Sequence, residues 1–299
     1  MTLFGLKNVV WLGIQAIAAG TRGVFGGGNT GSNSDVMDFI TIATEGTADE
    51  FGELTLARLY LAGVSSDTRG VFGGGNTGSN SDVMDYITIA TEGDATEFGE
   101  LTLARLYLAG VSSGTRGVFG GGHSGSNSDV MDYITIATEG DATEFGELTL
   151  ARHGLVGVSS DTRGVFGGGN AGGSSNVMDY ITIATEGHAD EFGDLTAARR
   201  ELAGVSSDTR GVFGGGYSFD VMDYITIATE GHADEFGELT AARYGLAGVS
   251  SDTRGVFGGG TTGSYSDMMD YITIATEGHA DDFGDLTSAR RYIAGVNGS

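Results

Sequence analysis

Arginine is the residue whose spacing most clearly predicts an interaction in this chain. Twelve of the 15 basic residues are arginines in two registers, one inside the recurring octapeptide TRGVFGGG and one after an alanine near the end of each repeat. One aspartate stands at the head of the third strand-like segment in every repeat, and a guanidinium can bind a carboxylate through two parallel hydrogen bonds. We therefore predict bidentate structural ion pairs rather than an anion-binding ring. The residues proposed for these pairs are Arg58, Arg105, Arg152, Arg199, Arg243 and Arg290 with Asp38, Asp85, Asp132, Asp179, Asp223 and Asp270.

Histidine could bind a metal ion, and three of the five histidines share one register. His188, His232 and His279 occupy a position that Asp94 and Asp141 hold in other repeats. We expect this position to be a turn at the outer rim, too far from its neighbouring copies for ligands about 2 Å from one metal ion. The Asn/Ser/Asp loops also lack a recognised calcium ligand spacing. We predict surface turns, with no metal and no cofactor.

Catalytic motifs are missing from the sequence. It contains no G-x-S-x-G and no H-E-x-x-H, and its glycine triplet ends a strand instead of opening a helix, so it is not a phosphate-binding loop. The absence of cysteine excludes thiol chemistry and cysteine-bound metals. We expect a protein that is not an enzyme.

Charge limits the class of partner. With 40 acidic and 15 basic residues the formal net charge is −25. Binding to nucleic acid or to an anionic membrane normally requires a basic stripe, so neither is expected. Protein subunits and surface glycans remain as candidate partners.

A repeat organises these residues. TRGVFGGG begins at residues 21, 68, 115, 162, 209 and 253. One repeat contains four strand-like segments, which are 61–64, 70–73, 86–91 and 97–101. Segment 86–91 carries no charge on either face, which is typical of a strand in a sheet covered on both sides. When four-stranded sheets stack radially around an axis, each sheet is covered on both faces by its neighbours. We therefore predict an all-β protein with six propeller blades, and a parallel β-helix is the alternative.

The repeat resembles the kelch repeat over residues 21–299. The shared features are an apolar second strand ending in Gly-Gly, a third strand with tyrosine and an aromatic residue in the fourth. The resemblance implies a kelch-like β-propeller, although phenylalanine replaces the fourth-strand tryptophan and the third strand has Asp-Tyr in place of Tyr-Asp. The wording TRGVFGGG…DYITIAT also resembles repeats of virion and tail-associated proteins of marine bacteriophages.

The two ends of the chain predict how the ring closes. The chain enters the repeat at a second strand and leaves after a first strand at 293–296, which would complete the first blade. Segment 14–17 is an alternative for that place. Residues 1–20 are then an apolar arm for assembly, or else a cleaved signal, and are too short to span a membrane. The arm residues are Phe4, Leu6, Val9, Val10, Trp11 and Leu12.

The six repeats differ at two places, the loop after the second strand and the two residues after each Ala-Arg. Both loops leave the same side of a four-stranded meander, and loops on a rigid scaffold often carry function. Neutral drift between duplications is the alternative. We expect a structural or adhesive component of an assembly, and the assembly that we favour is a bacteriophage virion or tail. A carbohydrate-binding lectin is the alternative function. The predicted aromatic anchors are Tyr60, Tyr107, Tyr217, Phe219, Tyr244, Tyr265 and Tyr292.

Overall fold

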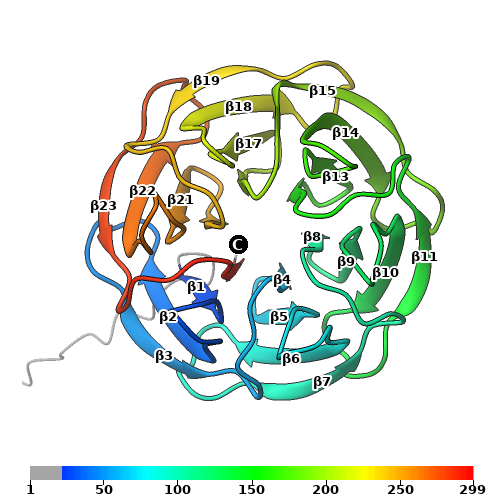
Figure 1. Ribbon diagram of the computed structural model, residues 1–299, viewed down its shortest axis with the longest axis horizontal. Coiled ribbons are helices and arrows are strands. Elements are labelled where there is room, and N and C mark those ends of the chain that lie inside the picture. The colour runs from blue at the N-terminus through cyan, green and yellow to red at the C-terminus, as the bar shows by residue number, and fades with distance from the viewer. Residues whose placement is uncertain (1–21, 299) are drawn as a thin grey trace, which may run out of the picture.

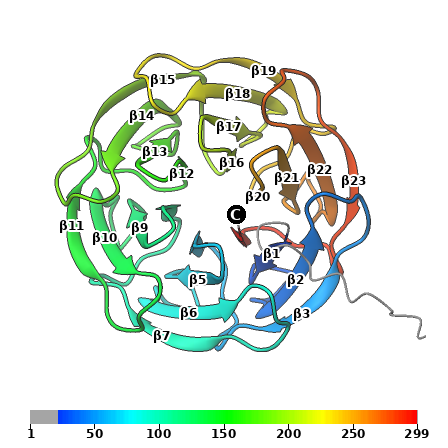
Figure 2. The same cartoon turned by 180° about the vertical axis from the view of Figure 1, so that it is seen from behind.

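A computed structural model describes residues 22–298, in which the chain forms six four-stranded antiparallel sheets arranged radially around a channel (Figures 1 and 2). This confirms a six-bladed β-propeller. From the innermost strand outward, the blades are β24 (Ala294–Asn297), β1 (Arg22–Gly26), β2 (Val36–Thr41) and β3 (Asp49–Glu53) in blade 1; β4 (Ala62–Ser65), β5 (Arg69–Gly73), β6 (Val83–Thr88) and β7 (Thr96–Glu100) in blade 2; β8 (Ala109–Ser112), β9 (Arg116–Gly120), β10 (Val130–Thr135) and β11 (Thr143–Glu147) in blade 3; β12 (Val156–Ser159), β13 (Arg163–Gly167), β14 (Ser175–Thr182) and β15 (Asp190–Arg199) in blade 4; β16 (Ala203–Ser206), β17 (Arg210–Gly214), β18 (Val221–Thr226) and β19 (Asp234–Glu238) in blade 5; and β20 (Ala247–Ser250), β21 (Arg254–Gly258), β22 (Met268–Thr273) and β23 (Asp281–Asp285) in blade 6.

The C-terminal strand closes the ring, as predicted. β24 pairs antiparallel with β1, with Val296 opposite Val24, and completes blade 1 at the centre of the propeller (Figure 1). This is the place that the alternative gave to segment 14–17. The proposed arm lies outside the described residues. Nowhere in residues 22–298 does a helix reach the length and apolarity that crossing a bilayer requires.

The third strand differs from its predicted boundaries. β6 covers 83–88 in place of the predicted 86–91, and Asp85 is paired inside it with Phe72 of β5. Charged residues are rarely found inside buried strands, so Asp85 led the sequence analysis to start the strand after it. The chain leaves the sheet after Thr88, where the Ile89 N–H donates to the Thr68 carbonyl at 2.9 Å.

The hydrophobic core lies between neighbouring blades. Phe119 of blade 3 is fully buried and packs with Val71 and Met84 of blade 2. Its ring covers Gly73, where a Cβ atom would lie 2.9 Å from the ring. Both faces of each sheet are therefore covered, which explains the uncharged segments in the sequence.

A glycine of the octapeptide is required by backbone conformation and by space. Gly74 directly follows β5 and has a φ of +68°, a region that side chains disfavour. A Cβ atom there would lie 2.8 Å from the Arg105 carbonyl oxygen. The glycine triplet therefore lets the chain turn out of the sheet against the segment that enters the next blade.

Candidate functional site

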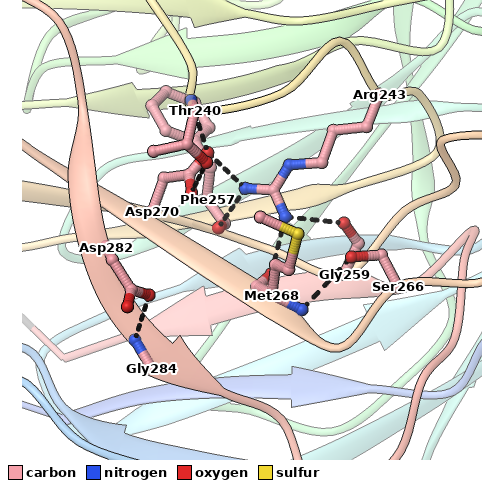
Figure 3. Close-up of polar contacts among 9 residues, drawn as sticks. All are labelled: Thr240, Arg243, Phe257, Gly259, Ser266, Met268, Asp270, Asp282 and Gly284. Atoms are coloured by element: carbon pink, nitrogen blue, oxygen red, sulfur yellow. Dashed lines mark hydrogen bonds and ion pairs between the residues drawn. The ribbon is translucent and has the colours of Figure 1, made fainter.

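A buried ion pair fixes the connection between neighbouring blades, and Figure 3 shows the one around Arg243. Its Nη2 lies 2.6 Å from Asp270 Oδ2 and 3.1 Å from the Phe257 carbonyl oxygen, while Nη1 donates to the carbonyls of Gly259 and Met268. The Thr240 hydroxyl donates to the other aspartate oxygen at 2.6 Å. The pair is therefore not bidentate, because arginine and threonine share the carboxylate.

The same pair occurs in every blade, between the residues that the sequence paired. Burial lowers the pKa of each of these arginines, and the charge of the facing aspartate opposes the shift. The two Nη groups of each guanidinium donate to protein acceptors, while its Nε is buried without a partner, so the pairs join the segment between blades to the next blade. The N–O distances are 2.5 Å for Arg58–Asp85, 2.7 Å for Arg105–Asp132, 2.7 Å for Arg152–Asp179, 2.5 Å for Arg199–Asp223, 2.6 Å for Arg243–Asp270 and 2.5 Å for Arg290–Asp38.

The arginine of TRGVFGGG pairs with a glutamate of the next blade and not with one of these aspartates. Arg69 stacks over Tyr86 at 4.0 Å, and its Nη2 lies 3.1 Å from Glu139 Oε1 in the next blade. The glutamate side chain is half exposed. The other five blades repeat this contact. Their pairs are Arg22–Glu92, Arg116–Glu186, Arg163–Glu230, Arg210–Glu277 and Arg254–Glu45.

The three rim histidines each face a carboxylate. His188 Nδ1 lies 3.6 Å from Glu147, and His232 and His279 face Asp194 and Glu238 in the same way. Within residues 22–298, no group of three or more histidine and acidic side chains is placed to hold a metal ion.

The two variable loops lie side by side on one face of the propeller, which we call the variable face. Leu59, which follows an Ala-Arg, bridges to Asn76 at the start of the loop after β5. Tyr244 bridges to Thr261 in the same way in blade 6. Sequence differences between the blades are therefore brought together on one surface.

At the centre of the variable face, six residues form a ring around the mouth of the channel. Each adopts a positive φ of 58° to 68°, and its N–H donates to the carbonyl of the equivalent residue in the preceding blade at 2.5–3.1 Å. The closed ring of hydrogen bonds holds the four side-chain-bearing members in a conformation that they disfavour alone. Beneath lies a cavity of about 140 Å³. The residues of this mouth ring are Tyr60, Tyr107, Gly154, Glu201, Gly245 and Tyr292.

Seven aromatic rings make a continuous band across the mouth, and Tyr217 at one end is 46 % exposed. Four of the six neighbouring pairs have centroid distances between about 4.5 and 7 Å, at which aromatic pairs attract each other beyond simple burial. The centroid distances along this aromatic band are 5.6 Å for His123–His153, 5.5 Å for His153–Tyr107, 3.7 Å for Tyr107–Tyr60, 4.3 Å for Tyr60–Tyr292, 6.4 Å for Tyr292–Tyr244 and 4.9 Å for Tyr244–Tyr217.

Charged groups flank the tyrosines of the band. Arg200 lies 4.7 Å over the ring of Tyr217, and Arg291 lies 4.7 Å over Tyr292. Burial raises the pKa of Glu201, while Arg200, a hydrogen bond from Tyr292 and the charge of Arg291 oppose the shift. Burial also raises the pKa of Tyr292, and the nearby Glu201 raises it further, so the phenol stays neutral.

Five of the seven predicted anchors lie in the aromatic band. Tyr265 reaches it through Arg291, whose guanidinium lies 5.0 Å over the Tyr265 ring. Phe219 is half-buried in the shortened loop of blade 5 and makes none of the ring contacts found among residues 22–298. The binding role of these residues stays a prediction. Sequence reasoning missed His123, His153, Arg200, Glu201 and Arg291 as site residues, although the two arginines outside the repeating registers could have been counted.

The variable face has two unlike halves. On one, asparagine side chains join neighbouring blades: Asn33 donates to the Asn76 carbonyl at 2.8 Å, and Asn80 and Asn127 repeat the contact to the next blade. We call this the laced half. The equivalent positions in blades 4 and 6 hold Ser174 and Tyr265, and blade 5 has the shortened loop. We call this side, with Arg200, Tyr217, Tyr244, Tyr265 and Arg291, the aromatic half.

Comparison with known proteins gives no match to a protein-family model and no similar curated protein.

Proposed function

We propose that this protein is a non-enzymatic binding module, a structural or adhesive component of a larger assembly that meets its partner through the variable face. The observation that carries the proposal is the aromatic band. Its seven rings gather on the face where otherwise near-identical blades differ. Tyrosine and arginine are enriched among the residues that carry most of the binding energy at protein interfaces.

A bacteriophage virion or tail is the assembly we propose, with a kelch-like repeat as the propeller's type. Support comes from the likeness of TRGVFGGG…DYITIAT to virion-associated repeats. In this proposal the apolar residues 1–20 attach the propeller to other subunits. The position of the gene beside capsid and tail genes would agree with it.

A lectin-like propeller is the second candidate function. The cavity of about 140 Å³ beneath the mouth ring favours it, because tyrosines and a carboxylate line a concave space that is partly apolar. In this role the protein acts without a larger assembly.

Assembly of the purified chain tests the two candidates. The full chain and a chain lacking residues 1–20 are compared by light scattering and electron microscopy. Rings or filaments that disappear on deletion support the assembly component. A monomer whose glycan binding is unaffected by the deletion contradicts it and supports the lectin.

The contribution of the variable face is tested with Tyr60→Gly and Tyr107→Gly. Gly154 and Gly245 hold the same positions in other blades and adopt the same positive φ, so these variants keep the mouth ring intact. We expect a folded propeller with weakened partner attachment. If both variants attach to the partner as well as the unaltered chain does, the variable face is not the binding surface.

A further inference from the structure

Two arginines stand apart from the structural ion pairs. The chain has 14 arginines, of which 12 occupy the two repeating registers. The other two are Arg200 and Arg291, and both lie on the aromatic half of the variable face. In a chain of net charge −25, the arginines of residues 22–298 that the scaffold does not use are both at this place.

The guanidinium groups are positioned by tyrosine rings. Arg200 rests over Tyr217 at 4.7 Å, and Arg291 rests between Tyr265 at 5.0 Å and Tyr292 at 4.7 Å. Stacking of this kind fixes the plane of a guanidinium and leaves its N–H groups at the edge for a ligand.

One carboxylate, that of Glu201, feels the charge of both arginines. Glu201 Oε1 is 3.7 Å from Arg200 Nε, longer than a direct hydrogen bond, and its Oε2 is buried without a partner. Unpaired buried polar atoms are costly, so a ligand hydroxyl that reaches this oxygen when the neighbouring side chains shift gains affinity. With one carboxylate and two guanidiniums, the local charge favours an anionic ligand.

Flat apolar surface completes the site. Tyr217 and Tyr244 lie 4.9 Å apart, and Tyr244 continues to Tyr292 at 6.4 Å. The faces of aromatic rings carry partial negative charge and attract polarised C–H groups, which sugars present on their apolar faces. Donors for a carboxylate, an acceptor for a hydroxyl and flat rings therefore occur together.

We propose that the aromatic half of the variable face binds a carboxylated carbohydrate. Arg200 and Arg291 bind its carboxylate groups, the tyrosine rings stack on its sugar rings, and Glu201 accepts a hydrogen bond from a hydroxyl. This inference rests on the proposed binding role of the variable face and names the class of ligand.

The other blades provide substitutions that the fold already uses. Leu59 and Leu106 occupy the position of Arg200 and Arg291 on the laced half, and Asn76 occupies that of Tyr217. Arg200→Leu, Arg291→Leu and Tyr217→Asn therefore change the proposed site into laced-half residues. Leu106→Ala on the laced half serves as the matched control.

Calorimetric titration of the full chain with tetragalacturonate tests the proposal. The methyl ester of the same oligosaccharide removes the charge and keeps the sugar. We expect the acid to bind at least about tenfold more tightly than the ester, and each arginine variant to weaken binding by about tenfold, as for a hydrogen bond to a charged group. Tyr217→Asn should weaken the acid and the ester alike, and Leu106→Ala should change neither.

Four results would overturn the proposal: equal binding of the ester, equal binding of tetraglutamate, binding that both arginine variants leave unchanged, or no binding of the acid at millimolar concentration. Circular dichroism melting is the check that each variant is folded. If the acid does not bind but Tyr60→Gly still weakens partner attachment, this inference alone is wrong. If attachment is also unchanged, the proposed function fails with it.

Discussion

Arg58 and Tyr60 are two residues apart in the chain, yet they belong to two very different regions of the molecule. Arg58 is fully buried against Asp85, and its five counterparts are all arginine with the same contact. Tyr60 stands in the mouth ring, where the counterparts are tyrosine, glycine and glutamate. The ring hydrogen bonds use only the backbone, so the fold tolerates different side chains at the mouth but not at the ion pair.

The difference teaches where function can vary in a repeat protein. The scaffold is specified by what is identical in all blades, and the face by what is not. If this is right, substitutions at the ion pairs should lower stability, and substitutions at the mouth should chiefly change binding. The predictions below test that division, beginning with the largest effect.

Breaking an ion pair should have the largest effect. Asp132→Ala leaves the buried Arg105 without its counter-charge, a change that costs about 3–5 kcal/mol in other proteins. Urea unfolding should show this loss, while Glu100→Ala at an exposed position should change little.

Arg105→Lys should also loosen the fold, because lysine cannot reach the same set of acceptors. An unchanged melting temperature and oligomeric state would count against the structural role.

The half-exposed arginine contact should be weaker. Arg69→Ala removes the stacking on Tyr86 and the contact with Glu139, for an expected loss of about 1 kcal/mol. Part of this loss should disappear in high salt, since the glutamate faces solvent. Urea unfolding at low and high salt measures both. A loss as large as that of Asp132→Ala would erase the distinction between buried and surface pairs.

The asparagine hydrogen bonds of the laced half should contribute less to stability than either kind of ion pair. Asn80→Ser places the blade 4 residue in blade 2 and removes the hydrogen bond to the His123 carbonyl, at an expected cost of about 0.5–1 kcal/mol. The reverse change, Ser174→Asn, is expected to stabilise the aromatic half slightly. Thermal melting of both variants is the measurement. Opposite signs from those expected would show that the asparagines do not join the blades.

Glu201 should give the smallest effect, and one that depends on pH. Because burial raises the pKa of Glu201, the carboxyl group binds its proton more tightly in the folded chain than in the unfolded chain. The ionised carboxylate therefore lowers stability above that raised pKa, and the cost disappears below the ordinary carboxyl pKa. Glu201→Gln should raise the melting temperature near pH 7.5 by more than near pH 4. Glu53→Gln at an exposed position is the control. A lower melting temperature near pH 7.5 would mean that the contacts of Glu201 outweigh its burial.

Much of the scaffold could be predicted from the sequence. The recurrence of TRGVFGGG counts the blades, and one aspartate and one Ala-Arg per repeat identify the buried pairs. The partner of Arg69 could not be found this way, because Glu139 lies in the next blade and in a turn that looks like ordinary surface. The strand boundary was missed because the ion pair neutralises Asp85 inside the strand.

The face was harder to predict than the scaffold. The sequence identifies where the blades differ, but not that Tyr60 and Glu201 share a positive φ, since glycine normally marks that conformation. The aromatic band joins residues from separate blades, so only ring closure brings Tyr217 and Tyr107 into one surface. Arg200 and Arg291 could have been singled out as the cations left over from the repeat.

Hydrogen exchange of the full chain with and without tetragalacturonate tests the central claim most directly. The account predicts that slower exchange on ligand addition is confined to the variable face, at residues 200–201, 217–220, 244–245, 261–267 and 291–292, with the laced half unchanged. Protection on the opposite face, at the serines 65, 112, 159 and 206, or at the outer rim would contradict it.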